Sequence, residues 1–201
     1  MLILDCVQGG PEWITAKIGI PSSSNYERIV DSKGNPSKQR GKYLIELAEE
    51  IIRGKITETY QSTDMLKGIV TESDAAELYE QIRQVEVEKV GFCFRDESKK
   101  YGCSPDRLVG KNGGLEIKSA KFSVQYERLT KDWSRAEHFQ QVQGCLLVSG
   151  RDWWDLMSYN DILPSIIIRF ERDEEFLRKL SDELDKFCLD LAITVKKIRE
   201  L

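Results

Sequence analysis

The sequence contains a single histidine, His138, and five cysteines that stand singly, with no Cys-x-x-Cys pair. One histidine argues against a zinc site and against a histidine-based catalytic triad. An odd number of scattered cysteines gives no disulfide framework and is typical of a reducing cytosol. No apolar run approaches the length that crosses a bilayer, and the opening MLILDCVQGGPEW lacks the basic region and cleavage site of a signal peptide. We therefore expect a cytoplasmic protein without a membrane contact.

The chain also lacks an excess of positive charge. Its 201 residues carry a formal net charge of −4, which argues mildly against a generic nucleic-acid binder, since such domains are usually basic. An enzyme whose basic groups line one channel stays possible, and an acidic metal cluster would itself lower the net charge. The length suits a single domain over residues 1–201, with N-terminal helices in 10–55 and a core in 68–201.

Hydrophobic periodicity predicts helices and strands in mixed order. Helices are expected near Pro11, after the serines at 22–24, and over 42–54, 68–84, 135–150 and 173–199. Strands are expected over 90–98, 100–110 and 114–120, as an antiparallel meander, and over 152–160 and 165–172. A loop with several lysines and arginines, residues 31–41, separates the first helices. This order indicates an α/β domain with a central mixed sheet flanked by helices.

The segment SPDRLVGKNGGLEIKSA, residues 104–120, contains two acids and a lysine around a glycine-rich turn. In a strand, Leu115 and Ile117 share one face, and Glu116 and Lys118 share the other. Asp106 precedes the turn, so a hairpin would place it near this polar face. The pattern therefore predicts two carboxylates and one amine at the same place.

Two neighbouring carboxylates repel each other unless a cation lies between them. Without histidine or cysteine, the usual cation is Mg²⁺ or Mn²⁺, which suits phosphate substrates. Such a metal polarises a phosphoryl oxygen and acidifies a bound water, and Lys118 could orient or deprotonate that water. This combination indicates hydrolysis of a phosphodiester. The alternative, which spacing alone does not exclude, is an exposed hairpin face with an ordinary Glu–Lys pair.

The same segment resembles the core motif of PD-(D/E)xK nucleases, with Ser104-Pro105-Asp106 followed by Glu116-Ile117-Lys118. Four further stretches are similar to the phage lambda exonuclease, or YqaJ-like viral recombinase, family. They are EWITAKIGIPSSSNYERI, FRDESKKYGCSPD, HFQQVQGCLLVSG and IIIRFERDEEF. The resemblance covers nearly the whole chain and implies a restriction-endonuclease-like core.

The resemblance implies a Mg²⁺-dependent 5′→3′ exonuclease, with Mn²⁺ as a substitute metal. It would degrade one strand of linear double-stranded DNA to mononucleotides and leave 3′ single-stranded tails. It further implies a homotrimeric ring, a single-strand annealing partner and a role in phage-type recombination. Two alternatives stay open: an endonuclease or junction resolvase with the same core, and a non-catalytic scaffold that binds DNA ends.

By resemblance, the catalytic residues are Glu72, Asp106, Glu116 and Lys118. The metal contacts are Asp96, Asp106, Glu116 and the carbonyl of Ile117. Glu72 corresponds to a helix glutamate that holds a metal-bound water or the nucleophile. Asp96 corresponds to an acid near the metals, and its alternative is an aspartate in a turn at the end of a strand.

The resemblance also implies a pocket for the DNA 5′-phosphate, formed by Lys17, Ser24, Ser104, Gln141 and Gln143. The family usually has arginine at the position of Lys17, and lysine lacks the bidentate fork of arginine. Gln141 and Gln143 are two residues apart, so only one can point squarely at the site from a helix.

Overall fold

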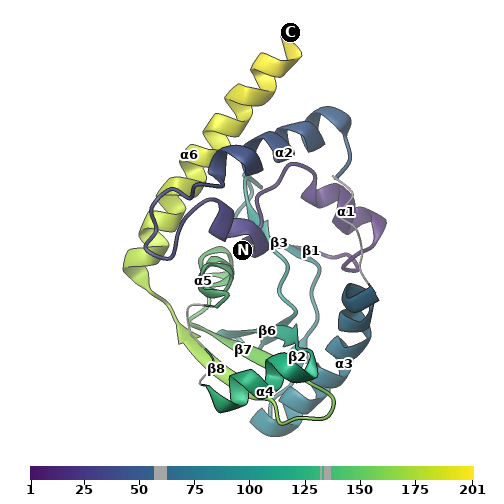
Figure 1. Cartoon of the computed structure of the whole chain (residues 1–201). Coiled ribbons are helices and arrows are strands. Elements are labelled where there is room, and N and C mark those ends of the chain that lie inside the picture. The colour runs from purple at the N-terminus through teal and green to yellow at the C-terminus, as the bar shows by residue number, and fades with distance from the viewer. Residues whose placement is uncertain (57–62, 132, 134–136) are drawn as a thin grey trace.

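Five strands form the central sheet of the computed structural model, in the order β2-β5-β6-β7-β8 (Figure 1). They are β2 (Val87–Glu88), β5 (Arg107–Val109), β6 (Gly113–Ser119), β7 (Trp153–Tyr159) and β8 (Ile166–Glu171). β6 and β7 are parallel and the other pairs are antiparallel, which confirms the predicted mixed sheet. The structure describes residues 1–56, 63–131, 133 and 137–201, except the side chains of 63–70.

A second, three-stranded sheet has the order β1-β3-β4. Its strands are β1 (Leu2–Leu4), β3 (Phe92–Phe94) and β4 (Gly102–Cys103). The predicted single strand over 100–110 is therefore wrong, because the chain leaves this sheet after Cys103 and enters the central sheet at Arg107. Pro105 lies at the break, and proline has no N–H to donate to a strand ladder. The break places Asp106 at the entrance to β5.

The helices are α1 (Pro11–Lys17), the 3₁₀ helix η1 (Ser23–Arg28), α2 (Arg40–Arg53), α3 (Thr63–Arg83), α4 (Phe122–Thr130), α5 (Phe139–Ser149) and α6 (Glu174–Arg199). α2 and α5 end at Gly54 and Gly150, both left-handed, as the sequence predicts. α4 was not predicted, because its large apolar residues do not form a buried face: Phe122 is 52% and Tyr126 58% exposed. Residues 135 and 136 of the predicted helix 135–150 lie outside the described residues.

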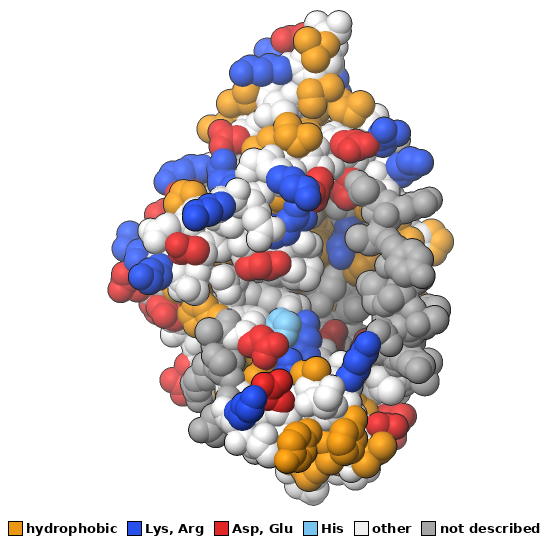
Figure 2. All heavy atoms as spheres, viewed as in Figure 1, with side chains coloured by type: hydrophobic (Ala, Val, Ile, Leu, Met, Phe, Trp, Pro, Cys, Tyr) orange, Lys and Arg blue, Asp and Glu red, His pale blue; other side chains and the backbone are white. Residues whose placement is uncertain are grey.

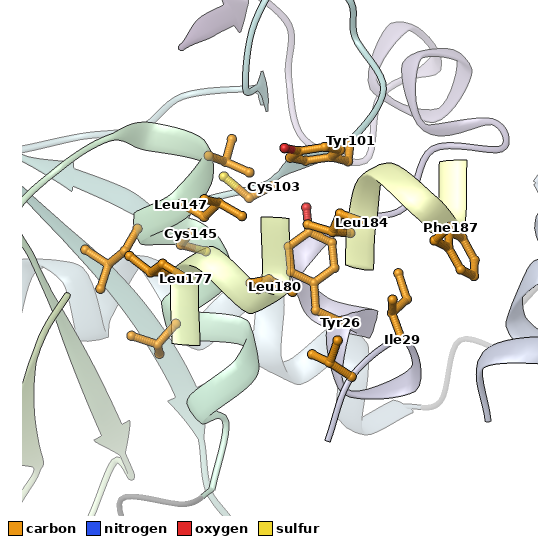
Figure 3. Packing of buried hydrophobic residues seen from close by; sticks show 14 of the residues in the cluster. Tyr26, Ile29, Tyr101, Cys103, Cys145, Leu147, Leu177, Leu180, Leu184 and Phe187 are labelled. Carbon is orange, nitrogen blue, oxygen red and sulfur yellow. The ribbon is translucent and has the colours of Figure 1, made fainter. Parts of the chain in front are cut away.

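Helices pack on both faces of the central sheet and create two apolar clusters. The larger one joins the sheet to η1, α2, α5 and α6, and Figure 3 shows Tyr26 of η1 among residues of α5 and α6. Gly144 of α5 permits this packing, since a Cβ there would lie 2.4 Å from the Tyr26 ring. The smaller cluster packs α3 against Leu115 and Ile117 of β6. β6 therefore presents its alternate residues, Glu116 and Lys118, toward α5.

The surface seen in Figure 2 carries acidic and basic side chains in mixture, and hydrophobic side chains gather at its lower end. In the part of the chain that the structure describes, no helix is both long and apolar enough to span a membrane.

Candidate active site

The β5–β6 hairpin brings Asp106 and Glu116 together. Arg107 is paired with Leu115, so Asp106 lies one step before that pair and opposite Glu116. The backbone N–H of Ile117 donates a hydrogen bond of 2.6 Å to Asp106 Oδ2. This bond fixes the Asp106 carboxylate against β6, on the face that also carries Glu116.

Lys118 and Gln141 complete the polar contacts of Glu116. Lys118 Nζ lies 2.8 Å from Glu116 Oε1, and Gln141 Nε2 donates to the same oxygen at 2.6 Å. Lys118 also donates to Gln141 Oε1 at 3.0 Å. The four side chains of Asp106, Glu116, Lys118 and Gln141 are here called the carboxylate cluster. α5 therefore supplies one member, and the hairpin supplies the other three.

The negative charge of this cluster is only partly compensated. Glu116 is 4% exposed, and its Oε2 is buried without a hydrogen-bond partner among the described residues. Burial, followed by the charge of Glu116, raises the pKa of Asp106 well above its usual value. Burial lowers the pKa of Lys118, but Glu116 and Asp106 raise it by more, so Lys118 remains an ammonium ion. One cation thus faces two carboxyl groups, of which Glu116 is buried and Asp106 is half-buried.

These features fit a divalent cation. A buried carboxylate oxygen without a partner is costly, and a hard cation with oxygen ligands would satisfy it. Asp106, Glu116 and the carbonyl of Ile117 are the residues that could hold the ion. Over the described ranges, no group of three or more His, Cys, Asp or Glu side chains is arranged to hold a metal. Two carboxylates with water ligands suit Mg²⁺, which usually retains several waters.

Glu72 approaches the cluster from α3, on the opposite face of the sheet. Its Oε1 lies 2.5 Å from Arg107 Nη1 and 3.4 Å from Lys89 Nζ. The charge of Glu72 contributes to the raised pKa of Asp106, so the two groups interact electrostatically. Glu72 is therefore near the cluster, but its carboxylate is ion-paired to Arg107.

Lys17, Ser24 and Ser104 lie on segments that converge beside the hairpin. Trp13 Nε1 donates to Ser104 Oγ at 3.0 Å, and Lys17 Nζ lies 3.8 Å from the centre of the Trp13 ring. Ser24 is exposed on η1, with its Oγ 3.2 Å from Ser22 Oγ. α1 is thereby connected to the residue two positions before Asp106.

Lys17 lines a pocket of about 360 Å³ together with residues of η1 and α2, among them Asn25, Arg28, Glu46 and Glu50. Burial lowers the pKa of Lys17 to about 8, against the opposing effect of Glu50. The recess therefore holds two cations and two acids, and Arg28 is ion-paired to Glu46 at 2.7 Å, which leaves Lys17 as the cation that could meet an anionic group.

Residues 12–152 of the chain match the family described as the YqaJ-like viral recombinase domain. The chain belongs to this family. Its structure is similar to LHK-Exo, an alkaline exonuclease from Laribacter hongkongensis, with 25% identity and a TM-score of 0.84 over 95% of this chain and 97% of that one. The complex of LHK-Exo with dAMP gives a TM-score of 0.85, with the same identity and coverage.

A phage-related exonuclease from Haemophilus somnus 129PT shares the fold at 14% identity, with a TM-score of 0.70 over 89% of this chain and 96% of that one. No curated protein matches the chain. Membership of the YqaJ-like family, with the match to LHK-Exo, supports a nuclease that binds DNA.

Two of the predicted site residues of this YqaJ-like protein lie elsewhere. Asp96 is exposed in the turn after β3, where its Oδ1 accepts hydrogen bonds from Ser98 N and Oγ. This is the turn role considered as the alternative, and it does not support a metal contact. Gln143 is 1% exposed; its Nε2 donates to the Glu171 carbonyl, and its Oε1 accepts from Asp173 N. Gln143 therefore joins β8 to α6, while Gln141 alone reaches the cluster.

Two residues near the cluster were missed by sequence reasoning. Arg107 directly follows Asp106 of the motif, and this position is the only feature of the sequence that could have indicated its place beside the site. His138 precedes α5, three positions before Gln141, with a φ of 62°. Burial and the nearby Lys118 lower its pKa to about 4, so His138 is neutral at pH 7 beside the YqaJ-like site.

Proposed function

We propose that the protein is a Mg²⁺-dependent exonuclease that degrades the 5′-ended strand of linear double-stranded DNA. The observation that carries this proposal is the pair of half-buried Asp106 and buried Glu116, with an unpartnered Glu116 oxygen and the Lys118 ammonium 2.8 Å from the other oxygen. A fully compensated pair would point to a structural role. The incomplete compensation here favours a site that takes up a cation with its substrate.

Asp106, Glu116 and the Ile117 carbonyl would hold the metal. When bound, Mg²⁺ polarises a phosphoryl oxygen and acidifies a water. Lys118 is positioned by Gln141 and Glu116, so its ammonium can orient the attacking water and stabilise negative charge that develops on the phosphate. Gln141, bonded to both, holds the lysine in one place.

The 5′-phosphate of the DNA end would be bound by Lys17, Ser24, Ser104 and Gln141. Lys17 supplies the positive charge, and the serine hydroxyls supply hydrogen-bond donors. Gln143 is left out of this set because both of its amide atoms bind the backbone. LHK-Exo binds dAMP, a mononucleotide. That complex supports mononucleotides as the products here. The strand left behind would be a 3′ single-stranded tail.

The wider assembly is also part of the proposal. A homotrimeric ring would confine positive charge to a central channel, which reconciles the net charge of −4 with DNA binding. The protein would act in the cytoplasm of a bacterial host, on phage or prophage DNA, beside a single-strand annealing protein. Mn²⁺ is expected to replace Mg²⁺. Light scattering of the purified chain tests the trimer, and a pull-down with an annealing protein tests the partner.

The central experiment is the digestion of three DNAs with Mg²⁺ and with EDTA: linear 5′-phosphorylated, linear 5′-hydroxyl and closed circular. We expect Mg²⁺-dependent loss of the phosphorylated linear DNA, with release of mononucleotides. Cleavage of the circle would instead indicate an endonuclease. Binding to DNA ends without any digestion would indicate a scaffold.

A further inference from the structure

Arg107 is a buried cation beside the carboxylate cluster. It is 7% exposed, and it belongs to β5, directly after Asp106. Because Arg107 is paired with Leu115, its side chain lies on the face of the sheet that packs against α3. Its guanidinium therefore points away from Lys118 and toward the helix that carries Glu72.

The Arg107 guanidinium joins Glu72 to the hairpin. Nη1 lies 2.5 Å from Glu72 Oε1 and donates at 2.5 Å to the backbone carbonyl of Asp106. Lys89 also faces Glu72 Oε1, but at 3.4 Å and with its side chain 55% exposed. An exposed pair at that distance contributes little, whereas a short pair with a buried arginine holds both groups in place. Arg107 is therefore the main constraint on Glu72 within the described contacts.

We propose that Arg107 is a positioning residue for the nuclease reaction. It holds the Glu72 carboxylate beside the hairpin and keeps it from becoming an additional metal ligand. This inference rests on the proposed nuclease function. Its physical basis is charge: Asp106, Glu116 and Glu72 are three acids, and Arg107 neutralises the one that comes from outside the hairpin.

The variant Arg107→Met removes this positive charge and releases Glu72. A divalent cation should then bind more tightly, by roughly threefold to tenfold, because the cluster becomes more negative. Turnover should fall by roughly 10- to 100-fold, the range for loss of a residue that supports metal ligands. Tighter metal binding together with slower turnover is a combination that a merely structural arginine would not produce.

Two further variants test whether the change in metal affinity comes from the Arg107 charge and from the released Glu72 carboxylate. Arg107→Lys keeps the charge, so metal affinity should return to the wild-type value. Turnover should recover only in part, because lysine lacks the planar fork. The double variant Arg107→Met/Glu72→Gln should lose the increase in metal affinity, because the released carboxylate is then absent. These variants also keep the test usable if Arg107→Met alone does not fold.

Arg151 provides the matched control. It donates from Nη1 to the carbonyls of Gly110 and Gly113 at 2.8 and 2.7 Å, at the turn of the same hairpin. Arg151→Met removes a guanidinium from the opposite end of the hairpin and should lower the melting temperature. Its metal affinity should stay at the wild-type value.

The experiment is calorimetric titration of the full chain with Mn²⁺ without DNA, combined with thermal unfolding and single-turnover digestion. The expected result is a higher Mn²⁺ affinity for Arg107→Met alone. Wild-type metal affinity and turnover in Arg107→Met would overturn the proposal, as would parallel losses of stability and metal affinity. A wild-type protein that binds Mn²⁺ but cleaves no DNA would instead contradict the proposed function, which separates the two failures.

Discussion

Two buried carboxylates on adjacent strands of the central sheet have opposite environments. Asp155 of β7 is 0% exposed and is bound by the Tyr79 hydroxyl at 2.8 Å and by Arg169 at 2.8 and 2.9 Å. Arg83 Nε also lies 3.5 Å from Asp155 Oδ2. Glu116 of β6 is 4% exposed, yet one of its oxygens has no hydrogen-bond partner in the described structure.

The difference separates a structural acid from a functional one. At Asp155, arginines and a hydroxyl offset the cost of burying the charge. At Glu116, a second carboxylate lies opposite, and the pKa of Asp106 rises because its carboxyl is desolvated and because the charge of Glu116 lies beside it. A stable fold retains such a pair where a ligand will complete it. The carboxylate cluster is therefore incomplete without a ligand, whereas the contacts of Asp155 are complete in the protein alone.

The largest effect is expected from Asp106→Ala or Glu116→Ala. Each variant removes a carboxylate that would hold the metal, so cleavage should fall by roughly a thousandfold or more, the equivalent of several kcal/mol of metal-ion catalysis. Binding to DNA ends, measured by fluorescence anisotropy in EDTA, should remain. Residual cleavage near the wild-type rate would contradict the assignment of the cluster as the active site.

Asp155→Asn should destabilise the fold by about 3 kcal/mol, because the three hydrogen bonds from Tyr79 and Arg169 each weaken by about 1 kcal/mol when their acceptor becomes neutral. Urea unfolding measures this change. Metal affinity should be unaffected, since the described contacts of Asp155 are with Tyr79, Arg83 and Arg169, and none is with the carboxylate cluster or Glu72. If the variant were as stable as the wild type, Asp155 would not be a structural carboxylate, and its difference from Glu116 would be lost.

Lys118→Ala should reduce turnover by roughly 100-fold, the lower end of the range for a group that assists proton transfer. Metal affinity should not fall, because Lys118 is a cation and not a ligand, and its removal leaves the cluster more negative. Calorimetry and single-turnover digestion together measure both quantities. A large loss of metal affinity would disagree with the role assigned to this lysine.

Lys17→Ala should reduce the preference for 5′-phosphorylated ends by roughly tenfold, the value of one charge-assisted hydrogen bond. In the wild type, the preference should also decline as the pH rises through about 8, because Lys17 loses its proton there. Competition for cleavage between DNA with 5′-phosphorylated ends and DNA with 5′-hydroxyl ends measures both effects. It should cover pH 6.5–9.5, which is roughly one and a half pH units on either side of that pKa. An unchanged preference in the variant would exclude Lys17 from the pocket.

The last expected effect is that of Asp106→Asn, which should stabilise the metal-free fold at pH 7. The folded-state pKa of Asp106 is raised, so the ionised carboxylate opposes folding at neutral pH. In the wild type this penalty disappears as the pH falls below the ordinary carboxyl pKa. The gain should therefore vanish in acid, and urea unfolding at several pH values measures it. A destabilised variant at pH 7 would show that the carboxylate is already compensated.

Much of the fold is predictable from short stretches of sequence, because neighbouring residues decide local structure. Gly54 and Gly150 end their helices, and the alternation in β6 separates Leu115 and Ile117 from Glu116 and Lys118. The short strands β1 and β2 escape prediction, since two or three residues show no period.

The sequence by itself determined the polar face of the hairpin and the motif that indicates the family. Only the tertiary structure decided that Gln141 reaches the cluster while Gln143 joins β8 to α6, and that Asp96 serves a turn. It also decided that Arg107 reaches Glu72, 35 positions earlier in the chain. The reason is that charge balance and burial depend on which helices and strands pack together, and the spacing of residues within one stretch of sequence does not determine that packing.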